Sequence, residues 1–189
     1  MNKGKVLVIS GPSAGVGKDT ILNILLARHP DWQRITTVVT RPPRAGEVNG
    51  VDYTFIDDHQ FKQWEKEGKF LETDFHADHW YGTPLNSVEE AISQAKNIIL
   101  RIDVNGSLEV KKAIPSAVLV YVGAENPAEL ESRIRARSET SGESEAEIKS
   151  RLELAKREAK LKPYFDHIVI NPENHPEKAV EEIEKILNI

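Results

Sequence analysis

The chain has 189 residues, no cysteine, a formal net charge of −5 and 39% hydrophobic residues. This length favours one folding unit with a sizeable core, the acidic balance disfavours nucleic-acid binding, and the lack of cysteine excludes disulfides, thiolate metal sites and thiol nucleophiles. No apolar run approaches the length of a membrane span, and residues 1–10 show no signal-peptide cleavage site. We therefore expect a cytoplasmic protein with no membrane partner.

The first predicted element is a buried strand over residues 5–10, KVLVIS, a mostly apolar, β-branched run. A glycine-rich loop follows, and residues 20–30 then carry apolar side chains at helical spacing until Pro30. A phosphate-binding loop requires this order of strand, loop and helix, because backbone N–H groups and the helix dipole then face the anion. An incidental glycine turn before a helix is the plainer alternative.

The loop itself, GPSAGVGKDT over residues 11–20, departs from the pattern G-x-x-x-x-G-K-[ST] at two positions. When the pattern is anchored on Gly17 and Lys18, Pro12 replaces a glycine and Asp19 replaces a hydroxyl residue. We expect Lys18 to contact nucleotide phosphates. Either Asp19 or Thr20 is expected to meet Mg²⁺, and a role for Asp19 away from the metal stays open.

Residues 34–83 interrupt the pattern of strands and helices. They are rich in Thr, Pro, Gly, Tyr and His, and contain short strand-like pieces at 35–40, 52–56 and 70–75. The segment therefore predicts a small mixed subdomain inserted between strands of the main sheet.

Within this segment, Arg41 and Arg44 flank two prolines and precede a glycine-rich turn. Two guanidinium groups so placed can bind one phosphate monoester, with the hydroxyls of Thr37 and Tyr53 as further donors. A solvated basic loop is the alternative interpretation.

A second group in the segment suits a guanine base. Guanine presents two adjacent N–H donors, N1 and N2, which the carboxylate of Glu72 can accept together, whereas adenine lacks that pair. Thr83 can donate to O6, and Tyr81 adds a ring and a phenol. Each residue alone is typical of a surface or a packed core, but their combination favours a base-reading site.

The rest of the chain alternates strands and helices. We expect strands over residues 97–104, 116–123 and 166–171, and helices over residues 86–96, 127–137, 144–161 and 176–187. Such alternation favours a parallel sheet covered by helices. The polar segment 137–151, RSETSGESEAEIKSR, predicts a mobile flap.

The motifs GPSAGVGKDT, TRPPRAGEVNGVDYTF, FLE, YGT, IDVNG and RIRAR occur in this order across about residues 5–188, and together they resemble those of guanylate kinase. The resemblance implies an α/β, three-layer P-loop kinase fold with a parallel sheet, an inserted small mixed α/β GMP-binding subdomain and a mobile lid. In a single domain, the core would comprise 1–33, 84–136 and 152–189, the insertion 34–83 and the lid 137–151.

The resemblance also implies the reaction and the residues that carry it. The donor would be ATP with Mg²⁺, and the acceptor GMP or dGMP. Carried over by position, the ATP-binding residues would be Gly11, Ser13, Ala14, Gly15, Val16, Gly17, Lys18, Asp19 and Thr20. The GMP-binding residues would be Thr37, Arg41, Arg44, Tyr53, Glu72, Tyr81, Gly82, Thr83 and Asp103. The catalytic residues would be Lys18, Arg41, Arg133, Arg137 and Arg151.

Two positions depart from the family pattern in a related way. Arg101 stands where the family usually has an acidic residue, while Asp19 adds an acidic residue to the loop. We hypothesise that the two changes compensate each other. Two other functions remain as alternatives: a kinase for another phosphorylated substrate such as ribose bisphosphate, and a non-catalytic binding module of guanylate kinase-like type.

Overall fold

The structure is a computed structural model that describes residues 4–12, 15–44, 46–76 and 78–189. Its strands are β1 (Val6–Ser10), β2 (Trp32–Arg34), β3 (Val38–Val39), β4 (Thr54–Phe55), β5 (Phe70–His76), β6 (His79–Pro84), β7 (Asn97–Arg101), β8 (Val118–Gly123) and β9 (His167–Ile170). Its helices are α1 (Lys18–Arg28), α2 (Asp58–Lys66), α3 (Leu85–Ser93), α4 (Val104–Ala113), α5 (Pro127–Ser141), α6 (Glu145–Ala159), the 3₁₀ helix η1 (Lys162–Tyr164) and α7 (Pro176–Leu187).

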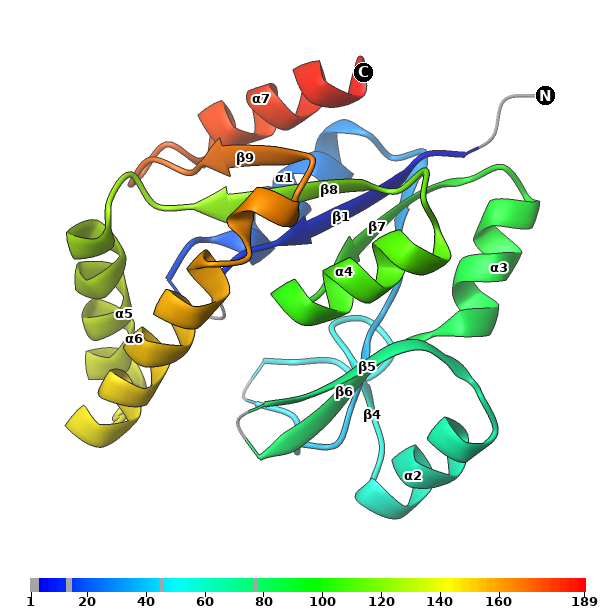
Figure 1. Cartoon of the computed structure of the whole chain (residues 1–189), viewed down its shortest axis with the longest axis horizontal. Helices are drawn as coiled ribbons and strands as arrows, with labels where there is room; N and C mark the ends of the chain where they lie inside the picture. Colours follow the sequence, from blue (N-terminus) through cyan, green and yellow to red (C-terminus); the bar gives the residue numbers. More distant parts are fainter. Residues whose placement is uncertain (1–3, 13–14, 45, 77) are drawn as a thin grey trace. The chain divides into compact units, whose positions relative to one another are not determined.

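The main sheet has five strands in the order β2-β7-β1-β8-β9 (Figure 1). β2 pairs with β7 in parallel, with Trp32 opposite Asn97, and β8 pairs with β9 in parallel, with Val120 opposite His167. All five residues of β1 are buried, as expected of a parallel strand covered on both faces. The predicted α/β class with a parallel central sheet is confirmed.

A second sheet, of order β4-β3-β6-β5, falls in the segment predicted as an insertion. β3 pairs with β4 in parallel, whereas β6 is antiparallel to both β3 and β5. The fully buried ring of Phe61 in α2 stacks on Phe70 of β5, with a centroid separation of 4.5 Å. Aromatic packing therefore holds α2 on this small sheet.

The chain divides into two compact units. Unit 1 comprises Met1–Val8 and Pro30–Val118, and unit 2 comprises Ile9–His29 and Leu119–Ile189. Unit 1 holds the whole second sheet with α2, α3 and α4. In unit 2, α1 packs on α7, and α5 packs on α6 through a cluster of apolar side chains: Leu130, Ile134, Ile148 and Leu152.

The polar segment predicted as a flap is helical over most of its length. α5 continues to Ser141 and α6 begins at Glu145, so only a short turn separates them. Gly142 ends α5 with φ 71°, and Ser144 and Glu147 form a capping box that starts α6. Polar composition here reflects exposed helical faces and caps, which sequence composition alone does not separate from a loop.

Two helices, α2 and α4, were not predicted. In α4 the first turn carries Asn105, Gly106 and Ser107, which are weak helix formers. The turn forms because the side chain of Asp103 caps it by accepting from the N–H of Gly106. For the same reason the predicted strand 97–104 ends earlier, at Arg101.

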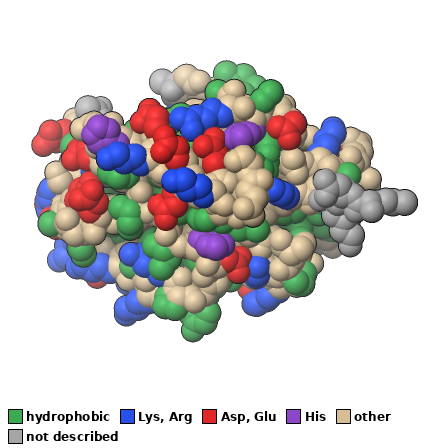
Figure 2. Space-filling view, turned by 90° about the horizontal axis from the view of Figure 1, so that it is seen from above, with side chains coloured by type: hydrophobic (Ala, Val, Ile, Leu, Met, Phe, Trp, Pro, Cys, Tyr) green, Lys and Arg blue, Asp and Glu red, His purple; other side chains and the backbone are tan. Residues whose placement is uncertain are grey.

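In the part of the chain that the structure describes, no helix combines the length and the apolar character needed to cross a bilayer. On the face shown in Figure 2, acidic and basic side chains lie interspersed rather than gathered by sign.

Candidate active site

Arg41 is the charged centre of a polar cluster in unit 1. Its side chain is 6% exposed, and it donates from Nη1 and Nη2 to the two carboxylate oxygens of Glu47, each at 2.6 Å. Glu47 Oε2 also accepts from the backbone N–H of Arg44, whose side chain is exposed. These contacts hold the pKa of Glu47 down, at about 2, chiefly through the hydrogen bond from Arg41. The pair fixes the edge of the Arg41 guanidinium that carries Nη1 and Nη2.

Two tyrosines lie beside Arg41. Its Cζ is 4.9 Å from the ring centroid of Tyr53, and the rings of Tyr53 and Tyr81 meet edge to face with centroids 6.4 Å apart. Burial raises the pKa of Tyr81, while the hydrogen bond with Arg41 opposes this shift. Thr37 is 7% exposed and immediately precedes β3. The structure therefore brings Thr37, Arg41, Tyr53 and Tyr81 into one unit, with the exposed Arg44 on the same loop.

Glu72 is a buried carboxyl group in the same unit. It lies opposite Thr83 in the β5–β6 pairing, and Thr83 Oγ1 donates to its Oε1 at 2.5 Å. Glu72 is 6% exposed, and its Oε2 has no hydrogen-bond partner among the described residues. Burial, together with the charges of Asp103 and Asp74, raises the pKa of Glu72 to about 8. Once ionised, this group can accept hydrogen bonds from a ligand at Oε2.

Asp103 approaches Glu72 from the start of α4. Both carboxylates border Gly106, where an added Cβ would lie 2.5 Å from Glu72 Oε2 and 3.1 Å from Asp103 Oδ2. Only glycine fits at this position while the two carboxylates keep their places. Burial, and then the charge of Asp74, raises the pKa of Asp103. The predicted pairing of Glu72, Thr83 and Asp103 therefore has a structural basis. Gly82, between Tyr81 and Thr83 in the same hairpin, is buried and lies opposite Thr73.

The phosphate loop lies in unit 2. Gly17 directly precedes α1, as its N-cap, with φ 71°. An added Cβ would lie 2.6 Å from Asn171 Nδ2, so this position requires glycine. Asn171 Nδ2 donates to the carbonyl of Val16 at 2.9 Å. Lys18 Nζ turns back on the loop and donates to the carbonyls of Gly11, at 3.0 Å, and Pro12. Ser13 and Ala14, both predicted to bind ATP, lie outside the described residues.

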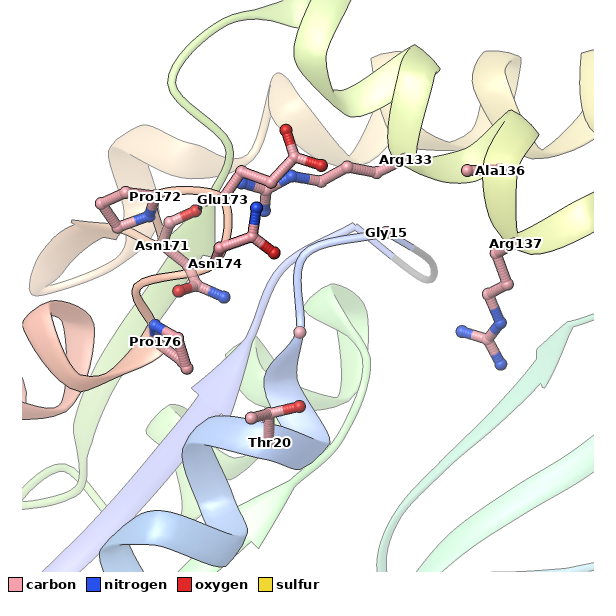
Figure 3. A pocket seen from close by; sticks show the side chains of 11 residues that line it. Gly15, Thr20, Arg133, Ala136, Arg137, Asn171, Pro172, Glu173, Asn174 and Pro176 are labelled. Atoms are coloured by element: carbon pink, nitrogen blue, oxygen red, sulfur yellow. Dashed lines mark hydrogen bonds between the residues drawn. The ribbon is translucent and has the colours of Figure 1, made fainter.

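A pocket of about 540 Å³ opens beside this loop. Figure 3 shows Asn171, Pro172, Glu173 and Asn174 on one side of the loop, and Ala136 and Arg137 of α5 on the other. The lining also includes Gly15, Gly17, Thr20, Arg133 and Pro176. The pocket thus joins backbone amides at a helix N-terminus to two arginines, an arrangement that suits a phosphorylated ligand.

A family model described as guanylate kinase matches residues 3–189. The guanylate kinase of Synechocystis sp. is 40% identical over 169 residues, which cover 89% of this chain and 86% of that protein. That of Gloeobacter violaceus is 39% identical over 183 residues, covering 97% of this chain and 86% of that protein.

The chain belongs to the guanylate kinase family. The predicted resemblance is therefore confirmed, and transfer of a phosphoryl group from ATP to GMP is the known function of this family.

Solved structures agree on the fold. Guanylate kinase from Anaplasma phagocytophilum superposes with a TM-score of 0.80 at 24% identity, covering 99% of this chain and 86% of that one. Shikimate kinase from Bacteroides thetaiotaomicron superposes with a TM-score of 0.51 at 10% identity, covering 98% of this chain and 99% of that one. Both likenesses concern the fold alone.

Three of the arginines that the guanylate kinase resemblance implies, Arg133, Arg137 and Arg151, lie in unit 2. Arg133 donates to Glu129 and, at 3.0 Å, to the carbonyl of Asn171. Arg151 in α6 donates to Glu143 at 2.6 Å. Arg137 is exposed and lines the pocket. The structure therefore brings Arg133 and Arg137 to the pocket, while Arg151 contacts the turn between α5 and α6.

The candidate metal ligands lie in the first turn of α1. Asp19 and Thr20 are both exposed, and Thr20 lines the pocket. Carboxylate and hydroxyl oxygens are ligands that Mg²⁺ accepts. The donor set of this turn therefore fits a magnesium ion that accompanies a nucleotide.

Several residues of the site were not predicted. Glu47 stands inside the motif TRPPRAGEVNG, and its acidic charge three positions after Arg44 was the available signal. Asn171 directly follows β9, and a polar residue at the carboxyl end of a parallel strand is a recognised signal of a ligand-binding site. In β5, the carboxylate of Asp74 bonds His76 Nδ1 at 2.7 Å. Asp74 and His76 lie beside Asp103 only in the folded structure, so the order of residues alone carries no signal of this contact.

Proposed function

We propose that this chain transfers the γ-phosphoryl group of ATP to GMP, and also to dGMP. The observation that carries the proposal is the buried carboxyl group of Glu72, with Thr83 bonded to Oε1 and no hydrogen-bond partner at Oε2 among the described residues. The N1 and N2 donors of guanine supply what this group lacks. Adenine, uracil and a ribose bisphosphate do not present that pair of donors.

The phosphate of GMP would be bound by the polar residues around Arg41. Arg41 and Arg44 supply positive charge, and the hydroxyls of Thr37, Tyr53 and Tyr81 supply further donors. Because Glu47 holds Arg41 through both terminal nitrogens, the guanidinium is oriented before the substrate arrives. Such preorganisation lowers the entropy that binding costs.

ATP would be bound by the unit 2 pocket. Backbone N–H groups of the loop and the N-terminus of α1 would face its phosphates. Lys18 would exchange its bonds to the loop carbonyls for bonds to the β- and γ-phosphates. Asn171 supports this loop through Val16 and also accepts from Arg133.

Mg²⁺ is part of the proposal. Asp19 or Thr20 would hold it, directly or through water, and the ion would neutralise charge on the triphosphate. The residues themselves perform the alignment that in-line transfer requires. Arg133, Arg137 and Arg151 would offset charge on the transferred group, and no protein nucleophile or general base is needed.

The test is a coupled assay of ADP formation from Mg·ATP, with GMP, dGMP, AMP, UMP and ribose bisphosphate offered in turn. We expect turnover with GMP and dGMP, and a loss of at least about a hundredfold in Lys18→Ala, since this lysine contacts charge that develops in the transition state. Lys112→Ala is the matched control, because this lysine is 71% exposed and pairs across one turn of α4 with Glu109.

Other outcomes would favour the alternatives. Turnover with ribose bisphosphate but not GMP would indicate a kinase for another phosphorylated substrate. GMP binding without turnover of any acceptor would indicate a binding module. The sequence also predicts no nucleic-acid partner, a cytoplasmic location, and the boundaries of the lid and the insertion. These stay predictions.

A further inference from the structure

Arg101 ends β7 and reaches a residue far away in the sequence. Its Nη2 donates to the phenolic oxygen of Tyr53 at 2.5 Å, and its Cζ lies 5.2 Å from the centroid of the same ring. Arg41 lies 4.9 Å from that centroid. Two guanidinium groups from different elements of unit 1 therefore contact one tyrosine.

The direction of this hydrogen bond restricts what Tyr53 can do. A phenol donates one hydrogen bond and accepts others, whereas a guanidinium only donates. Because the phenolic oxygen accepts from Arg101, its own hydrogen must point to a different acceptor. The neighbouring Arg41 guanidinium cannot serve as that acceptor, but a phosphate oxygen can.

The charge on Arg101 also favours donation by the Tyr53 hydroxyl. A hydroxyl that accepts from a cation is polarised, and its O–H becomes a stronger donor. The cation over the ring adds a second contact that restricts the ring's rotation. Arg101 thus affects both the orientation and the donor strength of Tyr53.

We propose that Arg101 is a positioning residue that fixes Tyr53 as a hydrogen-bond donor to the phosphate of the acceptor nucleotide. The inference rests on the proposed function, since it takes a nucleoside monophosphate as the ligand of this cluster. It assigns Arg101 to substrate recognition through Tyr53.

The test compares GMP with guanosine, which lacks the phosphate, by calorimetry and by GMP-dependent turnover. We expect Arg101→Gln to weaken GMP binding about tenfold, the loss typical of a hydrogen bond to a charged group, and to leave guanosine binding unchanged. The KM for GMP rises by a similar factor, while kcat changes less than about threefold, because the contact serves binding in both ground and transition states. Arg101→Lys restores part of the affinity.

A double-mutant cycle identifies the route of the effect. If Arg101 acts through Tyr53, adding Arg101→Gln to Tyr53→Phe costs less than about twofold more in GMP affinity. Arg28→Gln is the matched control, since this arginine of α1 bonds Glu184 on α7 and has no part in the cluster.

Each contrary outcome is distinct. Unchanged GMP affinity in Arg101→Gln, equal losses for GMP and guanosine, or full additivity with Tyr53→Phe overturns the role of Arg101 alone. Arg101-dependent GMP binding by a wild-type chain that turns over no GMP overturns the proposed function and supports the role of Arg101. No GMP binding by the wild-type chain overturns both.

Discussion

Glu72 is a buried carboxyl group whose surroundings disfavour the negative charge that guanine binding needs. The nucleotide-free protein raises its pKa to about 8, first by burial and then through Asp103 and Asp74. At neutral pH the group is therefore mostly protonated, although guanine needs its carboxylate as an acceptor of two bonds. Binding must then release a proton, so that substrate affinity is linked to pH.

This linkage gives a prediction for the acceptor. As pH rises from about 6 to about 8, the KM for GMP should fall, because a growing fraction of the free protein carries the ionised Glu72. Glu72→Gln should remove this dependence and weaken GMP binding by roughly 10- to 100-fold, since a charged acceptor is lost. Initial rates at several pH values measure both effects. Glu109→Gln on the exposed face of α4 is the control.

The ionisation of Glu72 changes folding stability in the direction opposite to its effect on GMP affinity. The folded pKa of Glu72 lies above the usual value of 4.5, so the folded chain binds more protons than the unfolded chain between these values. The free energy of unfolding contributed by this group is therefore fully present below about pH 4.5 and lost as pH rises through about 8. For binding, a profile that shows GMP affinity falling toward pH 8 would contradict the proposed role of Glu72 in binding guanine.

Much of the site at this scale follows from residue type and order. The long motif around Arg41 and the separate FLE and YGT motifs predicted residues that unit 1 does bring together. Glu47 and Asp74 were missed because their part depends on partners, Arg41 and His76, whose distances sequence does not provide. Lys18 was predicted by pattern, but its bonds to Gly11 and Pro12 follow only from loop geometry.

At the scale of elements, α4 shows how one side chain starts a helix. Asp103 caps it through the N–H of Gly106, and its carboxylate also lies beside Glu72. The residue therefore has a structural role and a proposed role in reading guanine. These two roles respond differently to substitution, because asparagine caps a helix about as well as aspartate.

Asp103→Ala should lower the free energy of unfolding by about 1 kcal/mol, the usual cost of removing a cap, with a Tm shift of about 2–4 °C for a chain of this size. Asp103→Asn should keep most of that stability but still weaken GMP binding. Thermal unfolding and GMP titration of both variants test this. Equal GMP affinity for Asp103→Asn and the wild type would limit Asp103 to capping.

The sequence predicts helices and strands well where burial of apolar side chains determines them. It predicts them poorly where local polar contacts determine them. β1, β7, β8 and β9 are short apolar runs, and their positions follow from composition. α2 and α4 begin at aspartate caps in polar surroundings, so that periodicity gave a weak signal. The turn between α5 and α6 depends on Gly142 and the Ser144 capping box rather than on a long disordered stretch.

At the scale of the whole molecule, the residues proposed to bind ATP and those proposed to bind GMP belong to different units. Lys18, Arg133, Arg137 and Arg151 belong to unit 2, whereas Arg41, Glu72 and the other proposed GMP residues belong to unit 1. Each nucleotide should therefore stabilise its own unit first.

Hydrogen exchange tests this division. GMP alone should protect backbone amides in 34–83 and at the start of α4, and ATP alone should protect the loop and α1, each by up to about 2.7 kcal/mol at a hundredfold excess over Kd. A ligand that joins adenosine to guanosine through phosphates should protect both sets. Protection of unit 2 by GMP alone, equal to that of unit 1, would show that the two nucleotides do not act on separate units.

The division of the chain within β1 has a consequence for its synthesis. Unit 1 is complete once Val118 has left the ribosome, but unit 2 joins Ile9–His29 to Leu119–Ile189. The apolar side chains of α1, Ile21, Leu22 and Leu25, are buried in the finished protein, and α1 packs on α7, which is translated much later than α1. While translation continues, this face of α1 lacks its final partner and is open to chaperones or aggregation. The phosphate loop is thus translated well before the residues that support it, such as Asn171, whose side chain bonds Val16.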